Sequence, residues 1–211
     1  TSDGGYAVVG SQYSASSQAD LILVKFSSSL EFESNTSYGG AGADSTYNNI
    51  ANDLQQTEDG GYILVGNTYN GFNYDVWVVK YNSLFALTWQ DTIKGVYDDF
   101  GNSVQQTQDG AYLVCGTSYD GTGYDIMLWK ITPPASIDGE PSYAVLFNSD
   151  ATTDNGTRDF GNHAQQTTDG GYIIVGTSAT GITLIKLTSA GVPDSTNFNT
   201  IGVQTLGVAG D

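Results

Sequence analysis

The chain has 211 residues, six of them basic and 23 acidic, so its formal net charge at neutral pH is −17. A surface this negative repels phosphate backbones and anionic lipids, and we therefore expect no nucleic-acid partner and no membrane insertion. A hydrophobic content of 39% excludes a disordered chain, and no apolar run approaches the roughly 18 residues of a membrane span. The abundance of Gly, Ser, Thr, Tyr, Asn and Asp favours strands and turns over helices.

One phrase recurs four times along the chain. It reads TSDGGYAVVG at the start, and then QQTEDGGYILVG, QQTQDGAYLVCG and QQTTDGGYIIVG at intervals of about 50 to 60 residues. The glycine after the aspartate never varies, whereas the following glycine is replaced once, by Ala111. Only the first glycine is therefore expected to adopt the left-handed conformation, in a three-residue hairpin turn. The repeats defined in this way span residues 1–56, 57–106, 107–166 and 167–211.

Each repeat is predicted to contain four short strands. The first strand ends in QQT before the Asp-Gly turn, and nothing supplies it in the first repeat. The second strand begins at the tyrosine after the turn, and both it and the third strand are apolar on both faces. The third strands are predicted at 20–26, 75–81, 125–131 and 181–187, and the fourth at 30–34, 87–93, 143–147 and 196–200.

Recurring sheets that are covered on both faces must stack against one another. We therefore expect an all-β chain in which residues 1–211 form a single β-propeller domain or a segment of one. Its blades would be four-stranded and antiparallel, and the first would lack its innermost strand. The open edge beside residues 6–10 is a template for another strand, so we expect a longer polypeptide or a neighbouring chain to complete it. Head-to-tail assembly into filaments would be one result.

The phrase QQTxDGGYIIVG, followed about 20 residues later by an aspartate, four apolar residues and a lysine, resembles a tandem repeat family. Those repeats are expected to form β-propellers with blades of kelch-like size, in secreted and surface proteins. The resemblance covers nearly the whole chain. It implies a propeller fold and an extracellular or cell-surface location, and it implies no catalytic residues.

Four of the six basic residues occupy the same position in each repeat, near the end of the third strand. Strand pairing would bring each lysine beside the Asp-Gly turn of its own repeat, where an ion pair would act as a structural clip. The alternative is a ring of amines that binds an anion. The expected clips are Asp3 with Lys25, Asp59 with Lys80, Asp109 with Lys130, and Asp169 with Lys186.

A binding surface is expected where the loops between strands two and three meet the connections between repeats. These loops are rich in Tyr, Asn and Asp, which suit sugars or a protein surface, although polar loops also serve solubility alone. The candidate contact residues are Tyr69, Tyr74, Tyr97, Asp98, Asp99, Tyr119, Asp120 and Tyr124.

Other sites are less well defined by the sequence. Asp98, Asp99, Asp154 and Asp159 are candidates for an irregular cation site, with Ca²⁺ as the possible ion, but no regular calcium-binding loop is present. Cys115 replaces valine and is expected to be buried and inert, and His163, the only histidine, is expected on the surface. We predict no catalytic residues and no cofactor.

Two functions follow from these patterns. The first is a non-enzymatic extracellular or cell-surface module for structure, assembly or adhesion, with protein partners. The second is a carbohydrate-binding lectin, or a polysaccharide-active enzyme, built on the same fold.

Overall fold

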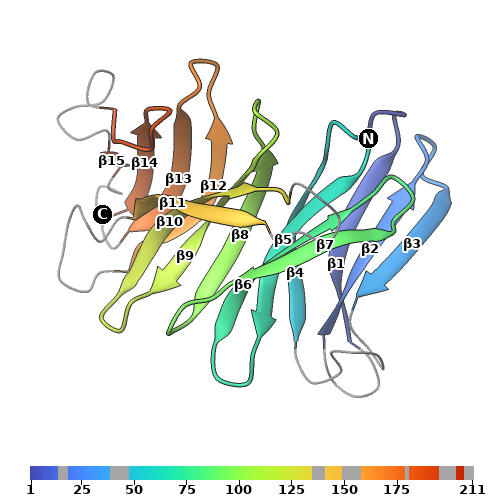
Figure 1. The fold of residues 1–211 in the computed structure, drawn as a ribbon, viewed down its shortest axis with the longest axis horizontal. Helices are drawn as coiled ribbons and strands as arrows, with labels where there is room; N and C mark the ends of the chain where they lie inside the picture. Colours follow the sequence, from blue (N-terminus) through green and yellow to red (C-terminus); the bar gives the residue numbers. More distant parts are fainter. Residues whose placement is uncertain are drawn as a thin grey trace, which may run out of the picture.

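The computed structural model describes residues 1–13, 19–38, 48–134, 141–148, 158–178, 181–194 and 203–206. The regular elements in these ranges are β-strands, which form four antiparallel sheets (Figure 1). Within the described residues, no helix is long and apolar enough to cross a membrane. The prediction of an all-β chain is therefore confirmed.

Each four-stranded sheet combines the strand that ends one repeat, within the bounds given above, with the strands of the following repeat, and the strands pair in chain order. The first sheet contains β1 (Tyr6–Tyr13), β2 (Ala19–Phe26) and β3 (Phe32–Tyr38). The second contains β4 (Asn49–Gln56), β5 (Tyr62–Tyr69), β6 (Tyr74–Tyr81) and β7 (Leu87–Ile93). The third contains β8 (Asp99–Gln106), β9 (Tyr112–Tyr119), β10 (Tyr124–Thr132) and β11 (Ser142–Asn148). The fourth contains β12 (Phe160–Gln166), β13 (Tyr172–Ser178), β14 (Gly181–Leu187) and β15 (Val203–Leu206). We call β4, β8 and β12 the inner strands.

The Asp-Gly turns have the predicted conformation. Gly4, Gly60, Gly110 and Gly170 have φ between 76° and 81°, whereas Ala111 is not among the residues with positive φ. In the second turn, the Gly60 N–H donates to the Thr57 carbonyl at 2.9 Å, and an Asp59 carboxylate oxygen accepts from the Gly61 N–H at 2.9 Å. The left-handed glycine lets the chain reverse direction within three residues, which sets the register of the following hairpin.

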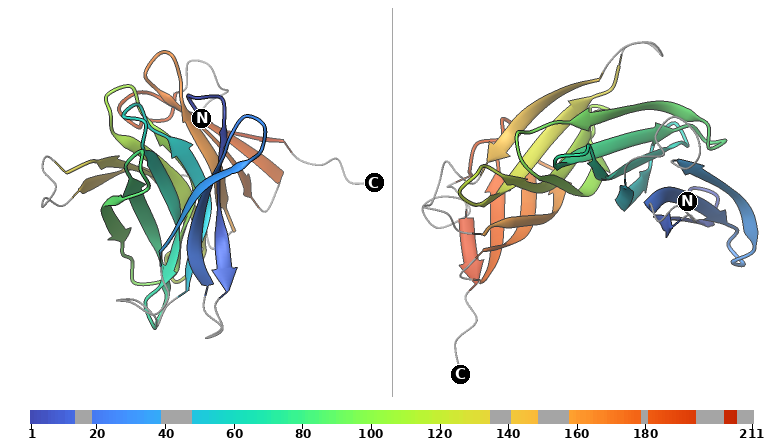
Figure 2. Two further views of the ribbon diagram at one scale, coloured as in Figure 1. Left: turned by 90° about the vertical axis from the view of Figure 1, so that its right-hand side faces the viewer. Right: turned by 90° about the horizontal axis from the view of Figure 1, so that it is seen from below.

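The four sheets stack in chain order along a curved arc (Figure 2, right). One apolar cluster fills each contact between consecutive sheets. Leu21 and Leu23 of the first sheet pack against Leu64 and Val79 of the second. The opposite face of the second sheet packs on the third, and the third packs on the fourth in the same way. Side chains alternate between the two faces of a strand, so an apolar strand in a middle sheet contributes to two clusters at once.

Burial on both faces, which was predicted for every second and third strand, is wrong for the sheets at the two ends of the arc. Tyr6 and Val8 in β1 are 51% and 50% exposed, and Val175 in β13 and Ile182 in β14 are 37% and 48% exposed. Within the part of the chain that the structure describes, an end sheet has one neighbouring sheet, so one of its apolar faces is not covered there.

Two fourth strands also differ from prediction. Leu30 lies in a turn with φ of 64°, so β3 begins at Phe32 rather than at residue 30. In the last repeat the fourth strand is Val203–Leu206, which pairs with β14. The predicted strand at 196–200 lies outside the described residues. The residues of the fourth strands share no common pattern between repeats, so these strands carry no recurring signal in the sequence.

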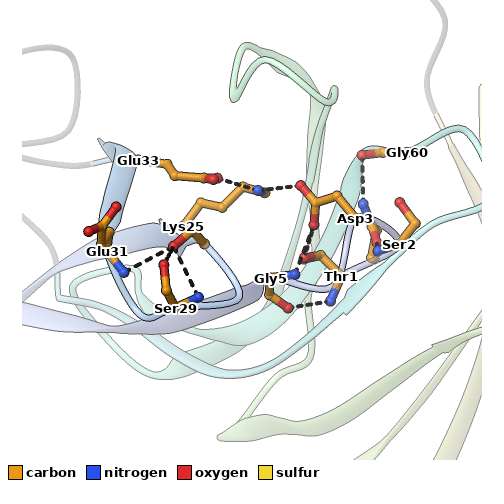
Figure 3. A network of polar contacts seen from close by, with 11 residues as sticks. Thr1, Ser2, Asp3, Gly5, Lys25, Ser29, Glu31, Glu33 and Gly60 are labelled. Carbon is orange, nitrogen blue, oxygen red and sulfur yellow. Dashed lines mark hydrogen bonds and ion pairs between the residues drawn. The ribbon is translucent and has the colours of Figure 1, made fainter.

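All four expected lysine–aspartate contacts are present. The distances between the lysine amine and the carboxylate are 2.5 Å for Lys25, 2.8 Å for Lys80, 2.5 Å for Lys130 and 3.0 Å for Lys186. Figure 3 shows the first of them, where the Lys25 amine lies between Asp3 and Glu33. Each amine binds the turn of its own repeat.

Burial is unequal within these ion pairs. The Lys80 side chain is 4% exposed, and its amine donates to Asp59 and, at 3.0 Å, to the Tyr81 carbonyl. The Asp59 side chain is 64% exposed. Burial opposes its ionised form, but hydrogen bonds from Lys80, Thr57 and Gly61 lower the pKa of Asp59 to about 2. The buried partner is therefore the cation, and it depends on an anion that lies in contact with water.

This asymmetry predicts unequal effects for two substitutions. Asp59→Asn leaves a buried ammonium without its counter-charge, so we expect the free energy of unfolding to fall by about 2 kcal/mol or more. Lys80→Met leaves only a solvated carboxylate and keeps an apolar stem, so we expect a loss of less than about 1 kcal/mol. Urea denaturation of both variants, and of the double variant, would measure this. A larger loss in Lys80→Met than in Asp59→Asn would contradict the account.

Candidate functional site

The predicted binding tyrosines form a row of aromatic rings at one end of the middle sheets. Tyr69 and Tyr74 have ring centroids 5.2 Å apart, and Tyr74 lies 5.7 Å from Phe100 of the next sheet. The row is repeated one sheet further along, over Tyr97, Tyr119, Tyr124 and Phe160, with centroid separations of 5.0 to 5.5 Å. The structure therefore brings all five predicted tyrosines into aromatic contacts and adds two phenylalanines.

The three predicted aspartates are all engaged in the scaffold. An Asp98 carboxylate oxygen accepts from the Tyr74 N–H at 2.9 Å, which ties the connection between repeats to the β5–β6 hairpin. Asp120 accepts from the N–H groups of Gly123 and Thr122 within its own turn, and these bonds lower its pKa. Asp99 is 4% exposed and cannot touch a ligand at the surface. The expectation that Asp99 would be an exposed contact residue is therefore wrong.

Asp99 instead lies in a buried acidic pair. Asp75, from β6, is 1% exposed and accepts from Asn70 Nδ2 at 2.8 Å. Burial raises the pKa of Asp99 to about 6, a hydrogen bond from Ser118 opposes the rise, and the charges of Asp75 and Asp98 add to it.

The predicted cation site is not assembled in the described residues. Within them, no group of three or more His, Cys, Asp or Glu side chains is placed to hold a metal ion. Asp159 is buried at the start of β12, and Asp154 lies outside the described residues. Calcium binding stays a prediction.

The most exposed apolar side chains beside the aromatic row, Phe72 and Val96, were not predicted from the sequence. Phe72, at the tip of the β5–β6 hairpin, is 94% exposed, and Val96, in the connection to β8, is 85% exposed. Tyr97 follows at 44%. Neighbouring exposed apolar side chains are typical of contact surfaces. The sequence feature that could have indicated this surface was a single phenylalanine, Phe72, within a polar loop.

The open faces of the end sheets form a second candidate surface. We call the face of the first sheet that points away from the second the head face, and the face of the fourth sheet that points away from the third the tail face. The head face carries Tyr6, Val8, Ile22 and Val24. The tail face carries Ile173, Val175, Ile182 and Leu184.

The head and tail faces are the two halves of a contact that occurs three times inside the arc. The repeat positions of Tyr6 and Val8 are filled by Tyr112 and Val114 in the third sheet, where both are buried against the second sheet. The position of Val175 is filled by Val65 in the second sheet, where it is buried in that same cluster. A head face and a tail face therefore have the residue pattern that the chain already packs together.

The recurring Asn and Gln residues join the inner strands of neighbouring sheets, a role that the sequence analysis did not identify. Gln55 Oε1 accepts from the Gln106 N–H at 2.5 Å, and Gln105 Oε1 accepts from the Gln166 N–H at 2.7 Å. In the same way, Asn52 donates to the Gly101 carbonyl at 2.8 Å, and Asn102 donates to the Gly161 carbonyl at 2.7 Å. We call these contacts the inner seam.

The second glutamine of each QQT extends the inner seam to the turns. Gln56 Oε1 accepts from the Ser2 N–H at 2.6 Å, and Gln106 and Gln166 accept from the Glu58 and Gln108 N–H groups at 2.8 and 2.9 Å. Contacts between sheets therefore explain the invariance of the two glutamines of QQT, while the threonine donates to the aspartate of its own turn.

Cys115 and His163 lie where the sequence predicted. Cys115 is fully buried, and burial raises the pKa of its thiol to about 12, so the reactive thiolate is disfavoured. His163 is exposed on β12.

No protein-family model matches the chain, and no curated protein matches it. The resemblance to a propeller repeat family therefore stays a prediction.

The buried acidic pair predicts an unusual dependence of stability on pH. Because the pKa of Asp99 is higher in the folded state than the usual 3.8, its favourable contribution is complete below about pH 4 and is lost as the pH rises through 6. Asp99→Asn removes this loss. We expect the variant to match the parent near pH 4 and to be more stable by up to about 3 kcal/mol near pH 8.

Urea denaturation of the parent and Asp99→Asn between pH 4 and 8 would measure the difference. Asp120→Asn is the matched control, and its effect on stability should have the opposite sign. The lowered pKa of Asp120 stabilises the fold above about pH 4, so this variant should be less stable than the parent there. A constant gap between the parent and Asp99→Asn across this range would contradict the account.

Proposed function

We propose that the chain is a non-enzymatic assembly module of an extracellular or cell-surface protein, and that its repeats form a segment of a β-propeller. The observation that carries the proposal is the match between the head face and the tail face. The sequential stacking of the sheets along an arc supports the propeller geometry. The resemblance noted in the sequence and the net charge of −17 suit an extracellular location.

The end faces favour contact with a second copy of the same chain. Each is a flat sheet face whose side chains are β-branched, leucine or tyrosine, and exposed apolar patches of this kind mark interaction surfaces. A head face that packs on a tail face is a heterologous contact, which leaves one face of each kind open at the two ends of the assembly. The proposed assembly is therefore a linear series of copies that either closes into a ring or extends into a filament.

Charge substitutions at the two faces provide a complementation test. Val8→Asp blocks the head face and Val175→Asp blocks the tail face, so we expect each variant alone to be monomeric. Mixed in equal amounts, they retain one usable head face and one usable tail face and should form a one-to-one heterodimer. Sedimentation velocity at moderate salt, which screens the net negative charge, would measure the species.

The parent chain is the reference and should form species larger than a dimer as its concentration rises. A dimer that persists in Val175→Asp alone would indicate contact between two head faces and would contradict the head-to-tail arrangement. A parent that stays monomeric at high concentration would contradict the assembly function.

Carbohydrate binding by the aromatic row is the second candidate function. It is favoured by the partly exposed Tyr97 ring and the exposed Phe72 beside it, since aromatic faces with adjacent amide and carboxylate groups suit sugar rings. A lectin would bind without turnover, whereas an enzyme would release product from the same ligand.

A glycan array followed by titration would test this second function. We expect Tyr97→Ala and Phe72→Ala to weaken binding of any captured glycan by about fivefold or more, because each removes aromatic contact area without touching the core. Leu84→Ala, at an exposed position in the β6–β7 turn, is the matched control and should bind like the parent. Absence of binding across the array would rule out the candidate.

A further inference from the structure

A groove lies along the free edge of β1. It has a volume of about 460 Å³ and is lined by Thr1, by residues 7–9 of β1 and by residues 52–56 of β4. In the three other sheets the second strand pairs with an inner strand, whereas in the described residues β1 pairs only with β2. The groove thus lies where the other repeats have their inner strand.

Gly10 has no evident role in the structure as it stands. Its equivalents in the other sheets are Gly66, Gly116 and Gly176, where an added Cβ would come within 1.8, 1.9 and 2.4 Å of an inner-strand carbonyl oxygen. A Cβ on Gly10 would meet nothing within 4 Å. Glycine inside a strand costs about 0.5–1 kcal/mol relative to alanine, so the other three positions are explained by close approach of the inner strand and Gly10 is not.

By equivalence with the other inner strands, β4 offers the groove one N–H donor and one carbonyl acceptor of the inner seam. Gln56 is equivalent to Gln106 and Gln166, whose N–H groups each donate to a glutamine side chain of the preceding inner strand. Ala51 is equivalent to Gly101 and Gly161, whose carbonyls each accept from an asparagine of that strand. A strand in the groove would therefore meet β4 through an asparagine and, three residues later, a glutamine.

We propose that this groove binds an extended polypeptide segment of the pattern F-G-N-x-x-Q-Q, which adds to β1 as its fourth strand. The carbonyl of the phenylalanine would pass over Gly10, as the Phe100 carbonyl passes over Gly116. Backbone hydrogen bonds to the β1 edge supply affinity, and the asparagine and glutamine supply specificity. The groove shares Val8 with the head face, but strand addition uses the backbone edge of β1 rather than that face, so it does not depend on the assembly function.

The probe is the synthetic peptide RDFGNHAQQTT, which copies residues 158–168 and has balanced charge against the acidic chain. Binding is measured by fluorescence anisotropy to the Val175→Asp variant, whose blocked tail face removes the proposed self-association. We expect saturable binding, together with slower hydrogen exchange at residues 7–10. The same peptide with alanine in place of its asparagine and first glutamine should bind at least about tenfold more weakly.

Gly10→Ala is the decisive variant on the protein. It should fold normally, because the space around Gly10 is open, and it should lose peptide binding, because a Cβ would occupy the path of the incoming carbonyl. Val24→Ala, on the head face and outside the groove, is the matched control and should bind like its parent. Equal binding by Gly10→Ala, or no binding by any variant, would overturn the proposal. The protein could also self-associate in the absence of peptide. If Gly10→Ala abolished that self-association, a second copy of the chain would be the occupant of the groove, and the proposed occupant would be wrong.

Discussion

The structure depends on how the unpaired edges of its inner strands are satisfied. Each of β4, β8 and β12 pairs with one strand of its own sheet, and its other edge faces the neighbouring sheet. Backbone groups on that edge cannot be left without partners when they are partly buried. On β8 and β12, side chains of the preceding inner strand bind them, through Gln55 and Gln105 for the N–H groups and Asn52 and Asn102 for the carbonyls. The corresponding edge of β4 faces the groove beside β1. This constraint fixes the offset from one sheet to the next.

The apolar clusters then fill the space that this offset defines. They are made from residues of varied size, such as Trp129 and Val78 in one cluster and Leu128 and Ile174 in another, so apolar packing alone would tolerate several displacements of one sheet on another. The directional hydrogen bonds at the inner seam do not tolerate such displacements.

The sequence predicted features that each repeat encodes locally. The left-handed glycine at Gly60 and the contact of Lys80 with Asp59 follow from turn chemistry and strand pairing within one hairpin. Features that depend on a neighbouring sheet were missed. Exposure of Val8 reflects the absence of a sheet beside it in the described residues, and Asp99 is buried where the charge of Asp75, from the neighbouring sheet, adds to the rise of its pKa. The role of QQT was recognisable only as recurrence, since its partners lie about 50 residues away.

The placement of the basic residues has a consequence for proteolysis. Four of the six lie in ion pairs with the turns, at the ends of β2, β6, β10 and β14. The other two, Lys94 and Arg158, are exposed in the connections that precede β8 and β12. A protease that cleaves after basic residues attacks exposed connections before paired strands. Limited trypsin digestion would therefore cut the native chain between its sheets, giving one fragment with the first two sheets and one fragment for each of the others.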